Sequence, residues 1–186
     1  QKKEKSHMKV LNMLAHPIIL FILVFPLMLV SHFVPQHVVW VSFSCWALYF
    51  LLGANLKDGL WGALCFILGE IFAAIIIIQF LATPGLGMWS LVISVAFWAA
   101  VIIFLSERIP QIAAVPAYFQ GAALYFAAYF LWWPVQSFTS EGTNYITPLI
   151  YVALSMLFGF LLGWCTVWLY GVWGKFYAKY EEPAEA

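Results

Sequence analysis

The chain has 186 residues, of which 65% are apolar and only 9% are charged, and its formal net charge at neutral pH is zero. A soluble domain of this length carries about 25% charged residues, because its surface must be wetted. Eight basic and eight acidic side chains cannot cover such a surface, so the composition excludes a water-soluble globule. The balanced charge also gives no reason to expect a nucleic acid as a partner.

Six apolar stretches are long enough to cross a bilayer, since a spanning helix needs about 20 mainly apolar residues. They cover residues 17–34, 38–56, 59–81, 88–105, 112–133 and 146–172. We therefore predict an all-α integral membrane protein, a bundle of six transmembrane helices. Residues 1–7 are interpreted as a tag remnant, 8–175 as one membrane domain, and 176–186 as a cytoplasmic polar tail.

The basic residues predict how this bundle is oriented in the membrane. With six spans, the cations that follow residue 7 all fall on one side: Lys9, Lys57, Arg108, Lys175 and Lys179. The three connections on the other side, 35–37, 83–87 and 134–144, contain no lysine or arginine. Because basic loops face the cytoplasm, both termini are predicted to be cytoplasmic.

Two parts of the chain echo each other in sequence. Residues 43–50 read FSCWALYF and residues 119–126 read FQGAALYF. The spans that follow share a second pattern, with ALC before a glycine in 63–69 and ALS before a glycine in 153–159. A duplication of three spans inserts its second half upside down, and such inverted repeats recur in transporters. Chance similarity between apolar helices is the alternative.

Small residues recur at helical spacing in the third and sixth predicted spans, so that each set forms a stripe on one face. The two stripes consist of Gly62, Cys65, Gly69 and Ala73, and of Ser155, Gly159 and Gly163. Small side chains let helix backbones approach closely in lipid. We predict that both spans pack against other helices, within one copy or between the copies of a homo-oligomer. A pore wall is the alternative.

Glu70 is the one acid predicted at the middle of a span, and no basic residue lies near it in the sequence. A charge at that depth costs on the order of 3 kcal/mol, so the side chain is expected to face the protein interior or to carry a proton. We predict a pathway-lining or proton-binding group. A neutral acid that is hydrogen-bonded between helices is the alternative. The counterpart of Glu70 in the repeat is Phe160, which makes any such site asymmetric.

Two pairs of adjacent opposite charges lie in the predicted cytoplasmic turns, Lys57-Asp58 and Glu107-Arg108. They are candidates for a cytoplasmic mouth, with solvated turn charges as the alternative. No histidine pair has the spacing of helical metal ligands, and no nucleophile, phosphate-loop or zinc-protease motif is present. We predict no metal, no cofactor and no catalytic residue, and hence no enzyme.

Short motifs in the second, fifth and sixth predicted spans form a further pattern. They are Tyr49-Phe50 followed by Gly53 and by Leu56-Lys57-x-Gly59, then VPAYFQGA at 115–122 and LFGF at 157–160. Over about residues 38–173 the chain resembles a small bacterial inner-membrane family of the YcdZ type, whose domain has no known function. The resemblance implies a multi-pass protein of the bacterial inner membrane. It implies no activity, and Glu70 has no counterpart in the family pattern.

Three functional hypotheses follow. The first is a homo-oligomeric channel or facilitator for a small, uncharged solute, which rests on six spans, short loops and few charges. The second is a proton-coupled secondary transporter that uses Glu70. The third is a structural or partner-binding membrane subunit without transport. Flux that saturates and depends on pH distinguishes a carrier from a channel, and an absence of flux favours the structural subunit.

Overall fold

The computed structural model of the chain describes residues 2–34, 37–131 and 145–181. These residues form helices and short connections and contain no strand. In chain order the elements are α1 (Lys2–Phe33), α2 (Val39–Leu51), α3 (Leu56–Ala82), η1 (Pro84–Leu86), α4 (Met88–Arg108), η2 (Pro110–Ile112), α5 (Val115–Leu131) and α7 (Ile146–Glu181). The prediction of an all-helical protein is confirmed. The predicted break at 134–144 lies outside the described residues.

Four helices are long and apolar enough to cross a membrane: Met8–Phe33, Leu56–Ala82, Met88–Arg108 and Ile146–Lys179. The other two predicted spans are shorter, since α2 has 13 residues and α5 has 17. At a rise of 1.5 Å per residue they measure about 20 and 26 Å. A bilayer core is about 30 Å thick. The described helices therefore include four candidate spans and two shorter apolar segments.

The second predicted span, 38–56, extends further than the helix that forms there, because α2 ends at Leu51. Gly53 and Ala54 have φ angles of +102° and +54°, in the left-handed region that a right-handed helix cannot contain. The side chain of Asn55 then accepts a hydrogen bond from the Asp58 backbone N–H (3.0 Å) and caps the start of α3. A prediction from hydropathy alone therefore includes this tight turn in the second span.

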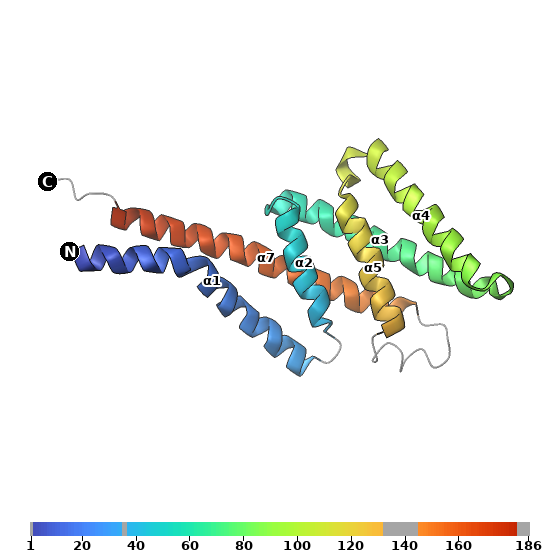
Figure 1. Cartoon of the computed structure of the whole chain (residues 1–186), viewed down its shortest axis with the longest axis horizontal. Coiled ribbons are helices and arrows are strands. Elements are labelled where there is room, and N and C mark those ends of the chain that lie inside the picture. The colour runs from blue at the N-terminus through green and yellow to red at the C-terminus, as the bar shows by residue number, and fades with distance from the viewer. Residues whose placement is uncertain (1, 35–36, 132–144, 182–186) are drawn as a thin grey trace.

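Both terminal helices extend beyond the predicted membrane segments. The helix α7 continues to Glu181, so the first part of the predicted polar tail at 176–186 is helical. The residues beyond position 181 lie outside the described ranges. The helix α1 contains Pro17 and Pro26, each of which removes a backbone donor from the helix. It bends along its length, and its first half runs beside the end of α7 (Figure 1).

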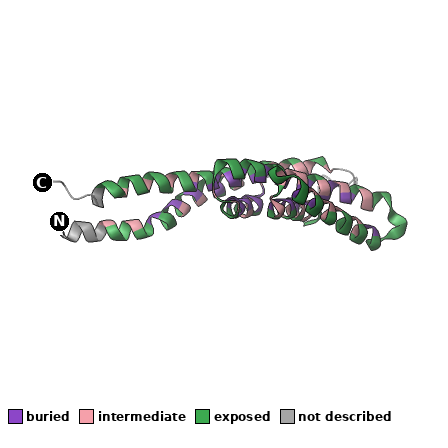
Figure 2. Ribbon diagram, turned by 90° about the horizontal axis from the view of Figure 1, so that it is seen from above, coloured by how far each residue is buried: buried purple, intermediate pink, exposed green. Residues whose placement is uncertain are grey.

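The helices pack in two similar groups. The most extensive contacts join α3 to α5 and α2 to α7. Outside these pairs, α4 lies along α3 and α1 lies along α7, at opposite ends of the molecule (Figure 1). The buried residues gather in the middle, where the pairs meet, and the outer faces of the helices are exposed (Figure 2). The exposed faces are rich in large apolar residues, as expected for surfaces that contact lipid.

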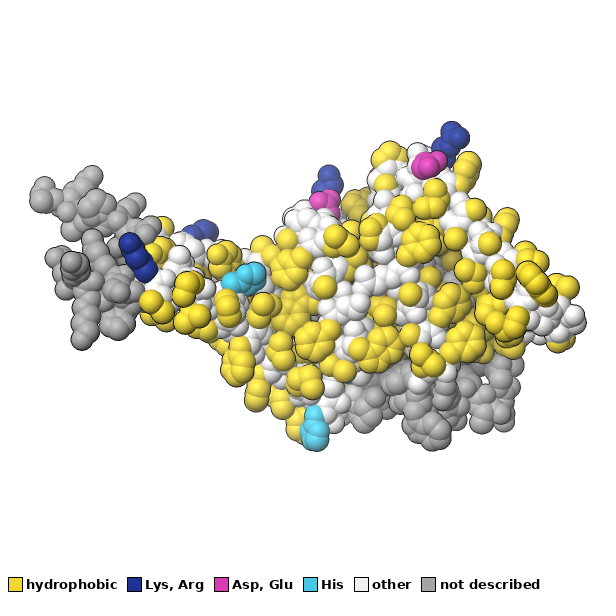
Figure 3. All heavy atoms as spheres, viewed as in Figure 1, with side chains coloured by type: hydrophobic (Ala, Val, Ile, Leu, Met, Phe, Trp, Pro, Cys, Tyr) yellow, Lys and Arg dark blue, Asp and Glu magenta, His cyan; other side chains and the backbone are white. Residues whose placement is uncertain are grey.

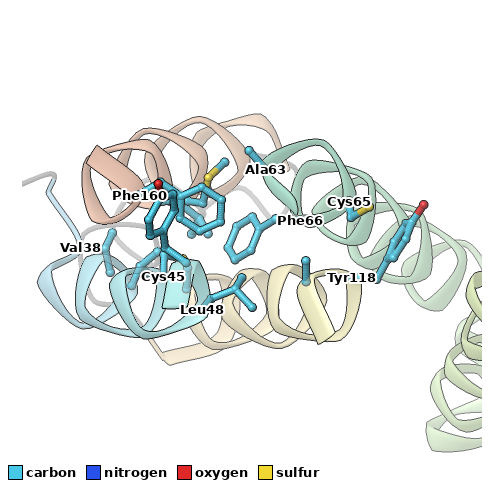
Figure 4. Close-up of a cluster of buried hydrophobic side chains, with 14 of the residues drawn as sticks. Val38, Cys45, Leu48, Ala63, Cys65, Phe66, Tyr118 and Phe160 are labelled. Atoms are coloured by element: carbon cyan, nitrogen blue, oxygen red, sulfur yellow. The ribbon is translucent and has the colours of Figure 1, made fainter. Parts of the chain in front are cut away.

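The core is formed by side chains from α2, α3, α5 and α7. Figure 4 shows Leu48 and Phe66 directed toward the space between these helices, and Cys65 next to the ring of Tyr118. Two tryptophans near the middle of the chain's apolar segments also link neighbouring helices. Trp46 donates to the Thr166 hydroxyl (3.0 Å), and Trp98 donates to the side-chain oxygen of Gln79 (3.1 Å).

Every residue of the two small-residue stripes is buried. A Cβ atom added at Gly69 would overlap the backbone carbonyl of Tyr118 in α5, and one added at Gly159 would overlap the carbonyl of Ser42 in α2. Gly163 lies against the ring of Tyr49. Backbone contact of this kind is possible only without a side chain, so these glycines determine how closely α3 approaches α5 and α7 approaches α2.

We expect Gly69→Ala and Gly159→Ala each to destabilise the protein by about 1–3 kcal/mol, the range for overpacked helix contacts. The added methyl group must displace a backbone carbonyl rather than a flexible side chain. The melting temperature of the detergent-purified protein measures the effect. Gly171→Ala is the matched control, because a Cβ atom there meets no atom within 4 Å. If all three variants melt alike, the close contacts do not exist in the folded protein.

Candidate functional site

Glu70 lies near the middle of α3, one residue after the glycine that contacts α5. Its side chain has no exposed surface. Neither carboxyl oxygen has a hydrogen-bond partner among the described residues. A polar group buried in this way costs about 1–3 kcal/mol even when it is uncharged. A fully buried acid without a partner is therefore a candidate for a group that binds something the structure does not contain.

The carboxyl group lies within the packed part of the bundle, where α3 contacts α5 and α7. The buried polar residues of the described chain are serines, a threonine and Glu70 itself, with no lysine, arginine or histidine among them. No buried cation is thus available to balance a negative charge on Glu70. The carboxylate is unfavourable here unless a proton or a cation accompanies it.

Sequence reasoning did not identify a stack of tyrosines where α5 packs against α3. Tyr125, Tyr129 and Tyr145, here called the tyrosine ladder, stack in succession with ring centroids 6.3 Å apart at each step. The Tyr125 hydroxyl also donates to the backbone carbonyl of Tyr145 (3.0 Å). Tyr125 and Tyr129 are four residues apart, so the sequence places them on one face of a helix. Nothing local in the sequence places Tyr145 against them.

A hollow of about 350 Å³, here called the His37 hollow, opens where α2 begins. It is lined by Val30, Val34, His37, Tyr151, Leu154, Ser155 and Phe158. Ser42 donates its only proton to the Ser155 carbonyl (2.7 Å), so the His37 Nε2–H must donate to the Ser42 oxygen (2.8 Å). Neutral His37 then accepts from the Ser31 hydroxyl at Nδ1 (2.9 Å). Burial lowers the pKa of His37 below its ordinary value, which favours this neutral form.

A second hollow of about 400 Å³, here called the Lys57 hollow, opens at the other end of α2. Its lining consists of Leu52, Lys57, Asp58, Trp61, Pro110, Gln111, Ala113 and Ala114. Of the predicted mouth residues, Lys57 and Asp58 line this hollow and Glu107 and Arg108 do not. The latter two are exposed at the end of α4, where the Arg108 guanidinium lies over the Phe104 ring at 5.3 Å.

The Lys57 and His37 hollows share no lining residue, and Glu70 lines neither of them. One hydrophobic cluster runs from Val38, beside the His37 hollow, to Leu52 and Ala114, which line the Lys57 hollow. Buried side chains of α2, α3, α5 and α7 fill this cluster (Figure 4). The buried hydroxyl of Tyr49 also has no hydrogen-bond partner among the described residues. The centre of the bundle thus combines tight packing with the unpaired polar atoms of Glu70 and Tyr49.

Comparison with known proteins identifies the family but no activity. No curated protein and no solved structure matches the chain significantly. Residues 12–172 match the family described as "Protein of unknown function (DUF1097)". This match covers most of the chain, including α2, α3, α4 and α5 in full and most of α7. The chain therefore belongs to the DUF1097 family of proteins of unknown function.

Proposed function

We propose that this membrane protein is a secondary transporter with six spans, built as an inverted repeat, in which Glu70 is the proton-binding group. The observation that carries the proposal is the fully buried Glu70 carboxyl, which has no hydrogen-bond partner among the described residues. Ionisable groups at membrane depth mark ion or substrate pathways far more often than they stabilise packing. The repeat, the topology and the closed centre each add support.

Matched contacts support the inverted repeat. Pairing Phe43 with Phe119 makes Ser42 the counterpart of Tyr118, and pairing the two ALC/ALS patterns makes Gly69 the counterpart of Gly159. The contact of Gly69 with the Tyr118 carbonyl is then the same contact as that of Gly159 with the Ser42 carbonyl. Random similarity between apolar helices does not predict that both contacts form at corresponding atoms.

Further contacts follow the same pairing. Val38 donates its backbone N–H to the Ser155 hydroxyl (2.9 Å), and the corresponding residues of the other half, Ala114 and Cys65, belong to one packed cluster. Residues 44 and 120 correspond to each other, and a hydrogen bond joins their side chains across the centre. The packing of α4 on α3 likewise corresponds to that of α1 on α7. A two-fold axis between the halves accounts for all of these contacts.

The charge distribution supports six spans with both termini on the cytoplasmic side, and the family resemblance favours the bacterial inner membrane. Lysine and arginine side chains lie along the upper and left edges of the face in Figure 3. The short helices α2 and α5 each run between these edges and the opposite side of the bundle (Figure 1). The proposed topology has both of these helices cross the membrane.

A carrier explains the closed centre better than an open channel does. The Lys57 and His37 hollows occupy corresponding places in the two halves, with Trp61 matching Tyr151 and Ala113 matching His37. They lie at opposite ends of α2 and are separated by the packed core. Alternating access through rocking of one repeat against the other requires this arrangement. The passive channel and the structural subunit remain the competing functions, and flux measurements distinguish them.

Topology reporters test the six-span arrangement. Fusions after Lys57, Arg108 and Lys179 are expected to give cytoplasmic signals, because the positive-inside rule holds these connections inside. Fusions after Pro84 and Glu141 are expected to give external signals, although Glu141 lies outside the described residues. Alkaline phosphatase and green fluorescent protein provide opposite readouts at each position. A cytoplasmic signal after Glu141 would contradict the six-span topology.

Uptake into proteoliposomes tests the role of Glu70. A panel of water, urea, glycerol, short organic acids and amines is measured with and without an imposed pH gradient. We expect one class of solute to enter in a saturable, gradient-dependent manner, and we expect Glu70→Gln to abolish the gradient dependence because it keeps the shape but cannot exchange a proton. Glu107→Gln, the same change at an exposed position, is the control.

Each competing function predicts a different result in this assay. A passive channel gives non-saturable flux whose dependence on pH is unaffected by Glu70→Gln. A structural subunit gives no flux of any solute above protein-free liposomes. Either result would contradict the proposed carrier, provided that the protein retains its melting temperature after reconstitution.

A further inference from the structure

The Lys57 hollow differs from the His37 hollow because it is lined by side chains of both charges. Lys57 and Asp58 lie in the first turn of α3, and Trp61 follows them on the same helix. From η2, Gln111 adds a neutral amide to the lining. With about 400 Å³, the hollow is within the size range of small-molecule sites. It therefore offers a cation, an anion, an amide and an aromatic ring to one bound group.

Both charges are available to a ligand. Lys57 is exposed, and its side chain forms no ion pair or hydrogen bond among the described residues. Asp58 completes the cap of α3, where its Oδ2 accepts from the side-chain amide of Asn55 (2.6 Å). A carboxylate has about four acceptor positions on its two oxygens, so the cap leaves Oδ1 available. The two residues can thus bind the opposite charges of one dipolar molecule.

Neither charge has a counterpart in the other half of the proposed repeat. The pairing used above matches Lys57 with Thr147 and Asp58 with Pro148. The corresponding His37 hollow is lined by no lysine, arginine or acid. The two charges are thus confined to the hollow on the side that the basic residues assign to the cytoplasm.

An exposed apolar strip continues from the Lys57 hollow along α3. Trp61 and Leu64 follow Lys57 by four and seven residues, so all three share one helix face. Trp61 is 39% exposed and Leu64 is 40% exposed. A tryptophan near a helix end that carries a lysine is typical of the boundary between headgroups and acyl chains. The hollow and the strip together match a molecule with a charged end and an apolar tail.

We propose that the Lys57 hollow binds the headgroup of a zwitterionic phospholipid whose ammonium group is primary. Lys57 pairs with the phosphate, Asp58 accepts a hydrogen bond from the ammonium group, and an acyl chain lies along Trp61 and Leu64. An anionic headgroup without an ammonium group leaves the Asp58 carboxylate next to the phosphate, which is repulsive. A choline headgroup has no N–H group to donate to that carboxylate.

This lipid site goes beyond the proposed transport, because it requires only that the hollow open at a membrane surface. In the proposed carrier the same hollow gives access from the cytoplasm, so a bound headgroup is expected to keep that access closed. Lipid binding can be measured without any flux, which keeps the two proposals separate.

Native mass spectrometry of the delipidated protein in detergent tests the site with three probes. Phosphatidylethanolamine, phosphatidylglycerol and phosphatidylcholine with identical acyl chains are added in turn. We expect phosphatidylethanolamine to bind most tightly, and we expect Lys57→Gln to weaken its binding about two- to fivefold, the range for an exposed ion pair. Asp58→Asn is expected to remove the preference for phosphatidylethanolamine over phosphatidylglycerol, because its amide oxygen preserves the cap but carries no charge.

Arg108→Gln and Glu107→Gln are the matched controls, because this pair of adjacent charges does not line the hollow. Equal affinity for the three lipids, or the same loss of affinity in Lys57→Gln and Arg108→Gln, would overturn the lipid site. Displacement of the lipid by an equal concentration of soluble glycerophosphoethanolamine would indicate a site for a free solute and would also overturn it. A failure of Glu70-dependent flux would contradict the transporter and leave the lipid site in place. Melting temperatures of the variants establish that each is folded.

Discussion

Close contact between helix backbones determines the structure of this bundle. In lipid, hydrophobic burial cannot draw helices together, so packing of small residues takes over that role. The α3–α5 contact at Gly69 and the α2–α7 contact at Gly159 hold the four central helices together. Because Glu70 directly follows Gly69, the same contact that joins α3 to α5 also places the carboxyl group within the core. The packing of α3 on α5 and the burial of the Glu70 carboxyl group therefore depend on the same contact.

In the proposed inverted repeat, Glu70 departs from the symmetry of the two halves. Under that pairing the contacts of Gly69 and Gly159 correspond to each other, whereas Phe160 stands in the place of Glu70. A buried polar group without a partner destabilises a fold, and an apolar side chain would avoid that cost at this position. An acid retained at such a cost is best explained by reversible binding of a proton or a cation.

Long apolar runs made α1, α3, α4 and α7 predictable, because 20 consecutive apolar residues have few alternatives to a spanning helix. The end of α2 was not predictable in the same way, since Leu51 and Leu52 continue the apolar run into a turn formed by left-handed residues. The small-residue stripes were visible at helical spacing. Their partners were not, because contacts such as Gly69 with Tyr118 join distant parts of the sequence.

The candidate site was predictable only in part. Glu70 stood out because a mid-span acid is rare, but the packing of α3 on α5 that buries it depends on the fold. The tyrosine ladder joins α5 to the residue that precedes α7, and it could not be read from local spacing. The adjacent charges in two predicted turns suggested one cytoplasmic mouth. Only Lys57 and Asp58 line the Lys57 hollow, because residues of η2, and not those at the end of α4, form the other side of that hollow.

The protonation state of Glu70 tests the central claim most directly. Infrared difference spectra of the membrane-embedded protein, wild type minus Glu70→Gln, isolate the carboxyl stretching band of this residue. Near neutral pH and without substrate, a buried acid with no cation beside it should show the band of a protonated carboxyl in a dry environment. A carboxylate band under the same conditions would show that Glu70 is paired or hydrated, and would contradict its role as the proton-binding group.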